Sequence, residues 1–166
     1  MKNKLNIVLY NPEIPQNTGN IIRSCYNSKA DLHIIEPASF NIWDPKMKRA
    51  SVTYVDKINI TLYKNWEEFI KKNNPKNIFY TTKFGQKNPS DLDLKKNKEP
   101  LFLVFGAESL GIPKKILFAN FDKCIRLPMK EDFRSFNLAN TVSIMLYEYN
   151  RQNDFLDMVR YWDKDN

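Results

Sequence analysis

Apolar residues follow two alternating patterns along the chain. Short apolar runs predict strands at residues 5–10, 32–35, 58–62, 78–82, 101–105 and 124–127. Between them, apolar residues spaced three and four apart predict helices at residues 16–28, 66–71 and 136–150, and Pro113 opens a further short helix. This alternation predicts an α/β fold with a mostly parallel sheet flanked by helices.

Three helical segments carry an apolar stripe. In residues 16–28 one side holds Ile21, Ile22, Cys25 and Tyr26. In residues 136–150 the stripe contains Leu138, Val142, Met145, Leu146 and Tyr149. Residues 155–162 place Phe155, Met158, Val159 and Trp162 at helical spacing and predict a final amphipathic helix. Its apolar face needs cover, either within the chain, which is the default, or from a second copy.

Size and composition favour one domain. The 166 residues are 42% hydrophobic, which suffices for one core, so we expect residues 1–166 to form a single domain. No run approaches the roughly 18 apolar residues of a membrane span, and the N-terminus leads directly into a strand pattern. We therefore expect a soluble, cytoplasmic protein. Cys25 and Cys124 stand in unrelated contexts, which gives no argument for a disulfide or a metal site and predicts two buried apolar residues.

The charge balance favours a polyanionic partner. The formal net charge is +7 and the pI is near 9.3, although the general abundance of Lys and Asn weakens this signal. A better candidate is the cluster of Lys46, Lys48 and Arg49, which lies among Phe40, Trp43 and Tyr54. Basic and aromatic side chains together suit phosphates and bases, and the alternative is an ordinary helix face.

Glycine is scarce, and its positions limit the kinds of nucleotide site. Gly19, Gly85, Gly106 and Gly111 form neither a G-x-G-x-x-G fingerprint nor a P-loop, which argues against a standard dinucleotide site. Polar turns nevertheless follow apolar runs at residues 11–23, 106–113 and 134–141. The last of these opens a helix, where free backbone N–H groups favour anions and hydrogen-bond acceptors. We expect these three turns to build a small-molecule or nucleotide site.

The same turns resemble a known family. The segments NPEIPQNTGNIIR (11–23), FGAESLGIP (105–113), LPM (127–129) and SFNLANTV (135–142) resemble the three ordered motifs of the SPOUT methyltransferases. More narrowly, the chain resembles the small bacterial tRNA (cytidine(34)-2'-O)-methyltransferases from about residue 5 to residue 152. The resemblance implies a C-terminal trefoil knot, a homodimer, S-adenosylmethionine as the cofactor, tRNA as the substrate, and no metal, membrane or appended RNA-binding domain.

The resemblance also assigns roles to residues. It implies cofactor contacts at Thr81, Thr82, Gly106, Glu108, Gly111, Leu127 and Ser135. It implies catalytic roles for Arg23, Asn17, Ser135 and Asn137. Substrate contacts are expected at Arg23, Arg134, Lys46 and Arg49. The expected reaction is 2'-O-methylation of the wobble nucleotide, cytidine or a modified uridine, and the alternatives are another tRNA or rRNA site or a non-catalytic RNA-binding module.

Each residue also has a simpler interpretation. Asn17 either orients Arg23 or the RNA, or caps a helix. Glu108 either pairs with Arg23 or holds loop amides, or it is an ordinary carboxylate at a helix N-terminus. Ser135 and Asn137 either cap the long helix or serve the cofactor and the ribose, and Arg134 either contacts phosphate or forms a surface ion pair.

The acid–base chemistry of the reaction also narrows the candidates. The single histidine, His33, lies inside a predicted strand and outside all three motifs, which favours a structural role. A guanidinium keeps its proton far above neutral pH, so we expect Arg23 to stay charged, to hold a phosphate and to stabilise the developing alkoxide.

Overall fold

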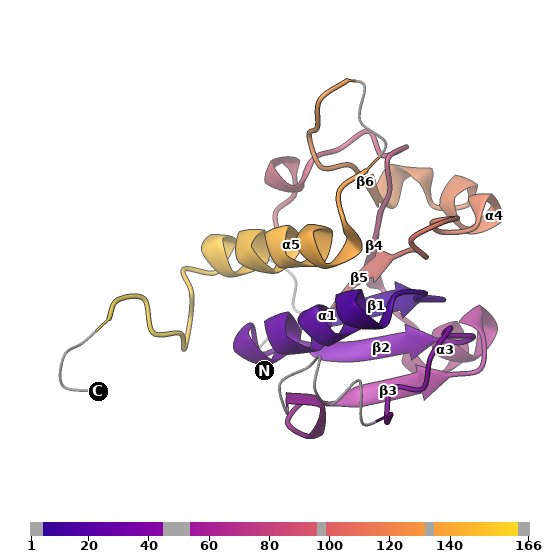
Figure 1. Ribbon diagram of the computed structural model, residues 1–166. Helices are drawn as coiled ribbons and strands as arrows, with labels where there is room; N and C mark the ends of the chain where they lie inside the picture. Colours follow the sequence, from indigo (N-terminus) through magenta and orange to yellow (C-terminus); the bar gives the residue numbers. More distant parts are fainter. Residues whose placement is uncertain (1–4, 45–53, 96–98, 132–134, 163–166) are drawn as a thin grey trace.

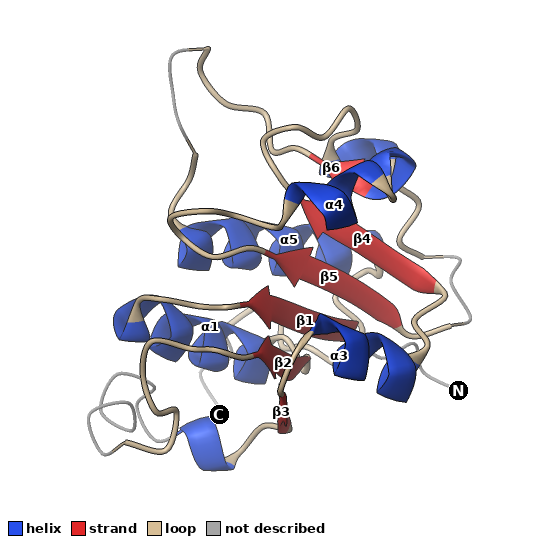
Figure 2. Cartoon of the chain, turned by 90° about the vertical axis from the view of Figure 1, so that its right-hand side faces the viewer, coloured by secondary structure: helices blue, strands red, loops and turns tan. Residues whose placement is uncertain are grey.

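In the described residues, six parallel strands form one central sheet (Figures 1 and 2). The computed structural model describes residues 5–44, 54–95, 99–131 and 135–162. The strands are β1 (Leu5–Tyr10), β2 (Asp31–Ile35), β3 (Ile60–Tyr63), β4 (Asn77–Thr81), β5 (Leu101–Phe105) and β6 (Cys124–Ile125). Their spatial order is β3-β2-β1-β5-β4-β6, and every pair is parallel. The predicted α/β class and parallel sheet are confirmed.

Helices cover both faces of the sheet. The helices α1 (Pro15–Asn27) and α5 (Leu138–Gln152) lie side by side on one face, and α3 (Trp66–Asn73) and α4 (Lys114–Phe118) lie on the other (Figure 2). Short 3₁₀ turns are η1 (Tyr54–Asp56), η2 (Pro89–Asp91) and η3 (Phe121–Lys123). The predicted helices are present, but α5 begins two residues later than predicted because Asn137 is its N-cap.

The core consists of two apolar layers, one on each face. Successive residues of β1 point to opposite faces, so Ile7 and Leu9 pack under α1 and α5 while Val8 packs under α3 and α4. On α1 the predicted stripe is buried except at Tyr26, which is 39% exposed. On α5 the buried residues are Ala139, Val142, Met145, Leu146 and Tyr149.

The predicted helix at residues 155–162 is wrong. Asp154, Phe155 and Asp157 have φ values of 53°, 49° and 61°, and such left-handed residues cannot continue a helix. Phe155 turns back to donate its N–H to the Asn150 carbonyl and places its ring 5.5 Å from that of Tyr147. The apolar residues beyond it lie open, with Leu156, Val159 and Trp162 between 67% and 87% exposed. An isolated stripe of this length has too little to pack on to form a stable helix.

The arrangement of strands fixes where a site can lie. The chain runs outward from β1 through β2 and β3, and then returns to β4 and β5, so β1 and β5 are neighbours at the point where the order reverses. Ligands of parallel sheets bind beyond the carboxyl ends of the strands at such a point. Among the described residues, none of the helices has the length and apolarity to cross a bilayer.

Candidate active site

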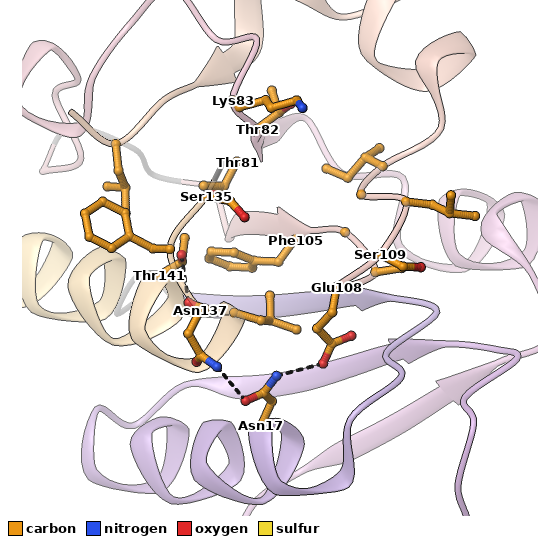
Figure 3. A pocket seen from close by; sticks show the side chains of 18 of the residues that line it. Asn17, Thr81, Thr82, Lys83, Phe105, Glu108, Ser109, Ser135, Asn137 and Thr141 are labelled. Carbon is orange, nitrogen blue, oxygen red and sulfur yellow. Dashed lines mark hydrogen bonds between the residues drawn. The ribbon is translucent and has the colours of Figure 1, made fainter. Parts of the chain in front are cut away.

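A cavity of about 840 Å³ lies at the carboxyl ends of the central strands. The residues that follow β1, β4, β5 and β6 line it, together with the first turn of α5 (Figure 3). Its deep wall contains Phe105 and Leu127, which are 1% and 5% exposed. At its mouth Phe84 and Leu110 are 49% and 88% exposed. The cavity therefore has an apolar interior with polar groups that converge on it, which is typical of a small-molecule site.

Three side chains form a bridge across one wall. Asn17 donates from Nδ2 to Glu108 Oε1 over 3.0 Å and accepts at Oδ1 from Asn137 Nδ2 over 2.9 Å (Figure 3). Asn137 Oδ1 in turn accepts from the backbone N–H groups of Ala139 and Asn140, which caps α5. All three predicted site loops are joined by this bridge.

Two carboxylates tie the loop after β1 to the loop after β5. Glu108 accepts from the backbone N–H groups of Glu13 and Ile14 over 2.8 and 3.2 Å. Glu13 accepts from the N–H and the hydroxyl of Ser109 over 2.8 and 2.6 Å, and these bonds lower the pKa of its carboxyl. The N-cap of α1, Ile14, has no capping side chain, so Glu108 places the negative charge at that helix end.

The loop after β5 folds back tightly on itself. A Cβ added at Gly106 would lie 2.2 Å from the carbonyl carbon of Gly111, so no larger residue fits. Gly111 has a φ of 70°, which favours glycine, and its N–H donates to the Ala107 carbonyl over 2.8 Å. Backbone groups of residues 106–111 therefore stand directly at the cavity wall.

The segment after β4 forms the opposite wall. Thr81 and Thr82 line the cavity, and the Thr81 hydroxyl is buried without a hydrogen-bond partner. The segment is held against the end of β6, where Thr82 N–H donates to the Ile125 carbonyl and Arg126 Nη1 donates to the Lys83 carbonyl, both over 2.8 Å. The Thr81 hydroxyl therefore has hydrogen-bonding capacity that no described group of the protein uses.

The predicted cofactor residues all lie on this cavity. They are Thr81, Thr82, Gly106, Glu108, Gly111, Leu127 and Ser135. Of the predicted catalytic residues, Asn17, Ser135 and Asn137 also line it. Arg23 does not: it is exposed on α1 and has no ion pair among the described residues. Arg134, Lys46, Lys48 and Arg49 lie outside the described residues.

The contacts of Asn17, Asn137 and Glu108 distinguish between their alternative roles. Asn17 lies inside α1 and bridges two loops, so it is not a cap. Asn137 is a cap and a bridging residue at once. Glu108 holds loop amides and has no bond to Arg23 in the described structure.

His33 and the two cysteines lie away from the cavity. His33 is buried between Asn6 and Tyr63, with its ring nitrogens 3.0 and 2.8 Å from their side-chain oxygens. Cys25 and Cys124 are buried, and burial raises the pKa of both thiols. Within the described ranges no group of three or more His, Cys, Asp or Glu side chains could hold a metal ion.

Sequence reasoning assigned no role to two residues of this site, Glu13 and Ser109. Both stand inside the quoted motifs, but they are 96 positions apart and no spacing links them. Their contact follows from the adjacency of β1 and β5. Only a prediction of that strand pairing could have revealed the contact in advance.

Known proteins resemble this chain over most of its length. The SpoU rRNA Methylase family matches residues 4–147. A protein of Saccharophagus degradans named tRNA (cytidine(34)-2'-O)-methyltransferase is 41% identical over 151 residues, which are 90% of this chain and 96% of that protein.

Two solved structures extend the comparison. One, from work on the 2-OH methylation of C/U34 on tRNA, is 33% identical with a TM-score of 0.83 and covers 92% of this chain and 98% of that one. The AdoMet-bound rRNA methyltransferase of Sinorhizobium meliloti is 25% identical with a TM-score of 0.80. That match covers 91% of this chain and 57% of the other.

Proposed function

Because this chain belongs to the SpoU rRNA Methylase family, we propose that it is an S-adenosylmethionine-dependent tRNA 2'-O-methyltransferase. Its target is the ribose of the wobble nucleotide, cytidine or a modified uridine at position 34. The observation that carries the proposal is the bridge from Glu108 through Asn17 to Asn137, which joins the three motif loops around one cavity. With tRNA as the substrate, we also propose that the protein acts in the cytoplasm.

The degree of similarity to the relatives favours tRNA over ribosomal RNA. The match covers 96% of the Saccharophagus degradans tRNA methyltransferase and 98% of the structure concerned with C/U34. The Sinorhizobium meliloti rRNA methyltransferase is less similar, at 25% identity against 41% and 33%. We propose that residues 1–166 act as a single domain on tRNA.

The donor groups of the cavity fit S-adenosylmethionine. Thr81 offers a buried hydroxyl without a partner, and the tight loop at Gly106 offers backbone groups beside apolar surface from Leu127. Such a wall suits a molecule with an adenine ring, a ribose and an amino-acid tail. The residues that would hold it are Thr81, Thr82, Gly106, Gly111, Leu127 and Ser135, with Glu108 fixing the loop from behind. The cofactor supplies an electrophilic methyl group.

The chain's own residues orient and activate the hydroxyl. Asn17 and Asn137 position polar groups at the cavity wall, and Ser135 stands beside them at the start of α5. From its position on α1 outside the cavity lining, the Arg23 guanidinium holds a substrate phosphate and lowers the cost of the alkoxide in this proposal. The hydroxyl proton then leaves to phosphate or water. Arg134, Lys46 and Arg49 complete the phosphate contacts in this proposal.

A second copy of the chain completes the assembly in this proposal. On α5, Ile144 and Tyr147 are 41% and 61% exposed, and the exposed apolar residues of the tail continue beyond them. Apolar surface of this kind is typical of an interface. Sedimentation velocity should give a homodimer, and a monomer at micromolar concentration would contradict it.

The trefoil knot is also a proposal. The segment after β4 is tied to the end of β6 at Arg126 and to the end of α5, where Leu94 N–H donates to Gln152 Oε1 over 2.8 Å. We propose that this segment surrounds the path by which the chain enters α5. An experimental structure that traces residues 126–137 tests this proposal, and a path outside the segment would contradict it.

Mapping the methylated nucleotide tests the function directly. Bulk tRNA is incubated with the protein and labelled S-adenosylmethionine, and nuclease fragments are analysed by mass spectrometry. We expect label only at the ribose of nucleotide 34. Label at another tRNA position, or label on ribosomal RNA alone, would overturn the substrate assignment.

A further inference from the structure

A group of two tyrosines and a lysine lies beside α1 and outside the cavity. Tyr26 of α1 stacks on Tyr54 of η1, with ring centroids 4.6 Å apart and ring planes 27° apart. Lys57 places Nζ 5.8 Å from the centroid of the Tyr26 ring and 5.6 Å from that of Tyr54. A cation within about 6 Å of an aromatic ring is attracted to its face. We call this group the Tyr26 platform.

Core packing accounts for only one of the two rings. Tyr54 is partly buried and packs against the apolar layer under α1. Tyr26 stays 39% exposed, although its neighbours on the same helix, Ile22 and Cys25, are fully buried. Tyr54 thus supports Tyr26 on its core side, and the backbone of Lys57 is held next to Tyr54 by its N–H bond to the Tyr54 carbonyl over 2.9 Å.

The Tyr26 platform continues the exposed side of α1 away from the cavity. Arg23 is exposed one turn before Tyr26, at the spacing that places helical side chains next to each other. Asn17, on the cavity wall, is nine positions before Tyr26, or about 14 Å along the axis at ~1.5 Å per residue. A strand of RNA whose ribose lies in the cavity would pass Arg23 and then reach the Tyr26 platform.

The charges around the Tyr26 platform favour RNA over a second copy of the chain as its binding partner. Helix α1 contains no acidic residue, and neither Arg23 nor Lys57 has an ion pair in the described structure. Asp56, next to Lys57, already has a partner of its own. A two-fold interface centred here would bring Arg23 and Lys57 toward their own copies, and like charges would repel. A polyanion with flat bases meets the same groups favourably.

We propose that the Tyr26 platform binds the anticodon loop, with an unpaired base beside the methylated nucleotide stacked on Tyr26 and its phosphate next to Lys57. The identity of the RNA rests on the proposed function, whereas stacking of a single-stranded base does not. Single-stranded loops are the part of RNA whose bases are free to stack on aromatic side chains.

Affinities for RNA and for the cofactor, measured separately, test the proposal. Fluorescence anisotropy with tRNA and with an anticodon stem-loop should give about 5- to 100-fold weaker binding for Tyr26→Leu. Tyr26→Phe and Tyr26→Trp should restore it. Lys57→Gln should weaken binding about 3- to 10-fold and reduce the slope of log K against log salt by about 0.7 to 0.9. The Kd for S-adenosylmethionine, measured by calorimetry, should not change.

The chain offers a matched control. Lys72 lies 5.9 Å from the centroid of the Tyr63 ring, but on α3, which covers the opposite face, and it pairs with Glu68 over 2.7 Å. Lys72→Gln removes the same charge from the same kind of contact and should leave RNA binding unchanged. Equal weakening by Lys57→Gln and Lys72→Gln would show general electrostatics and overturn the proposal.

Other outcomes separate the remaining explanations. If Tyr26→Leu does not fold, the surface variant Lys57→Gln still decides the matter. Unchanged RNA affinity in a folded Tyr26→Leu protein overturns the proposal, and so does a loss of binding accompanied by dissociation in the centrifuge. If the wild type methylates RNA elsewhere, the proposed function fails, but weaker binding of a single-stranded oligonucleotide by Tyr26→Leu still supports the Tyr26 platform.

Discussion

Asn17→Asp is the sharpest test of the bridge on the cavity wall. The substitution puts an oxygen in place of Nδ2, which lies 3.0 Å from Glu108 Oε1. Two charged carboxylates at that distance repel by about 5 to 6 kcal/mol at an effective dielectric of about 20. The folded protein avoids this by taking up one proton, which then joins the two oxygens. At pH 7, protonating a carboxyl with an ordinary pKa of about 4 costs about 4 kcal/mol. The free energy of unfolding of Asn17→Asp should therefore fall by no more than about 4 kcal/mol.

The sign of the pH dependence is fixed by the same proton. The folded variant holds a proton that the unfolded chain releases, so its stability deficit against wild type shrinks by about 1.4 kcal/mol per unit as the pH falls from 7 toward 4. Urea unfolding of both proteins at pH 7, 6 and 5 measures this difference. Asn20→Asp, on the exposed side of the same helix, is the control and should cost less than about 0.5 kcal/mol. A deficit no larger than that of the control, or one that acid does not reduce, would refute the bridge.

Four further substitutions test the cavity and the cation on α1. Thr81→Val removes a buried hydroxyl without a partner, so the free protein should stay as stable while S-adenosylmethionine binds about 3- to 10-fold more weakly by calorimetry. Gly106→Ala places a Cβ 2.2 Å from the Gly111 backbone and should abolish cofactor binding, whereas Gly111→Ala meets open space and costs only about 1 to 2 kcal/mol of backbone strain in thermal unfolding. Arg23→Ala should leave the S-adenosylmethionine Kd unchanged and reduce methyl transfer about 100-fold or more, and equal turnover would contradict its assigned role.

Much of the fold could be predicted from apolar periodicity, but the ends of the elements could not. The run at β5 is apolar throughout because both of its faces are covered. By contrast, β6 ends at Ile125 because the next N–H, from Arg126, bonds to the Lys87 carbonyl outside the strand. Tyr26 satisfies the helical spacing of the buried stripe but lies over η1 instead of the sheet. The spacing of apolar residues identifies the buried face of a helix. The elements packed against the helix decide how wide that buried face is.

The candidate site, like the fold, could be predicted only in part from the sequence. Resemblance to known motifs identified residues that lie on one cavity, and the structure brings together segments as far apart as Asn17 and Asn137, 120 positions along the chain. The two bonds that Ser109 donates to Glu13 had no sequence signal, because they depend on which strands are neighbours. The register of β1 on β5, with Leu9 opposite Phe105, brings the two loops level with each other.

The bridge from Glu108 through Asn17 to Asn137 also has a fixed direction of hydrogen-bond donation. This direction links the two roles of Asn137, as the N-cap of α5 and as a residue of the site. Its Oδ1 must face α5, because the two groups it contacts there are backbone N–H donors. Its Nδ2 must then face Asn17, whose Oδ1 accepts and whose Nδ2 is turned toward the carboxylate of Glu108. Donors at one end and a carboxylate at the other leave one orientation for both amides. Capping α5 is therefore what orients the site, because the same amide that caps the start of the helix fixes which atoms the cavity wall presents.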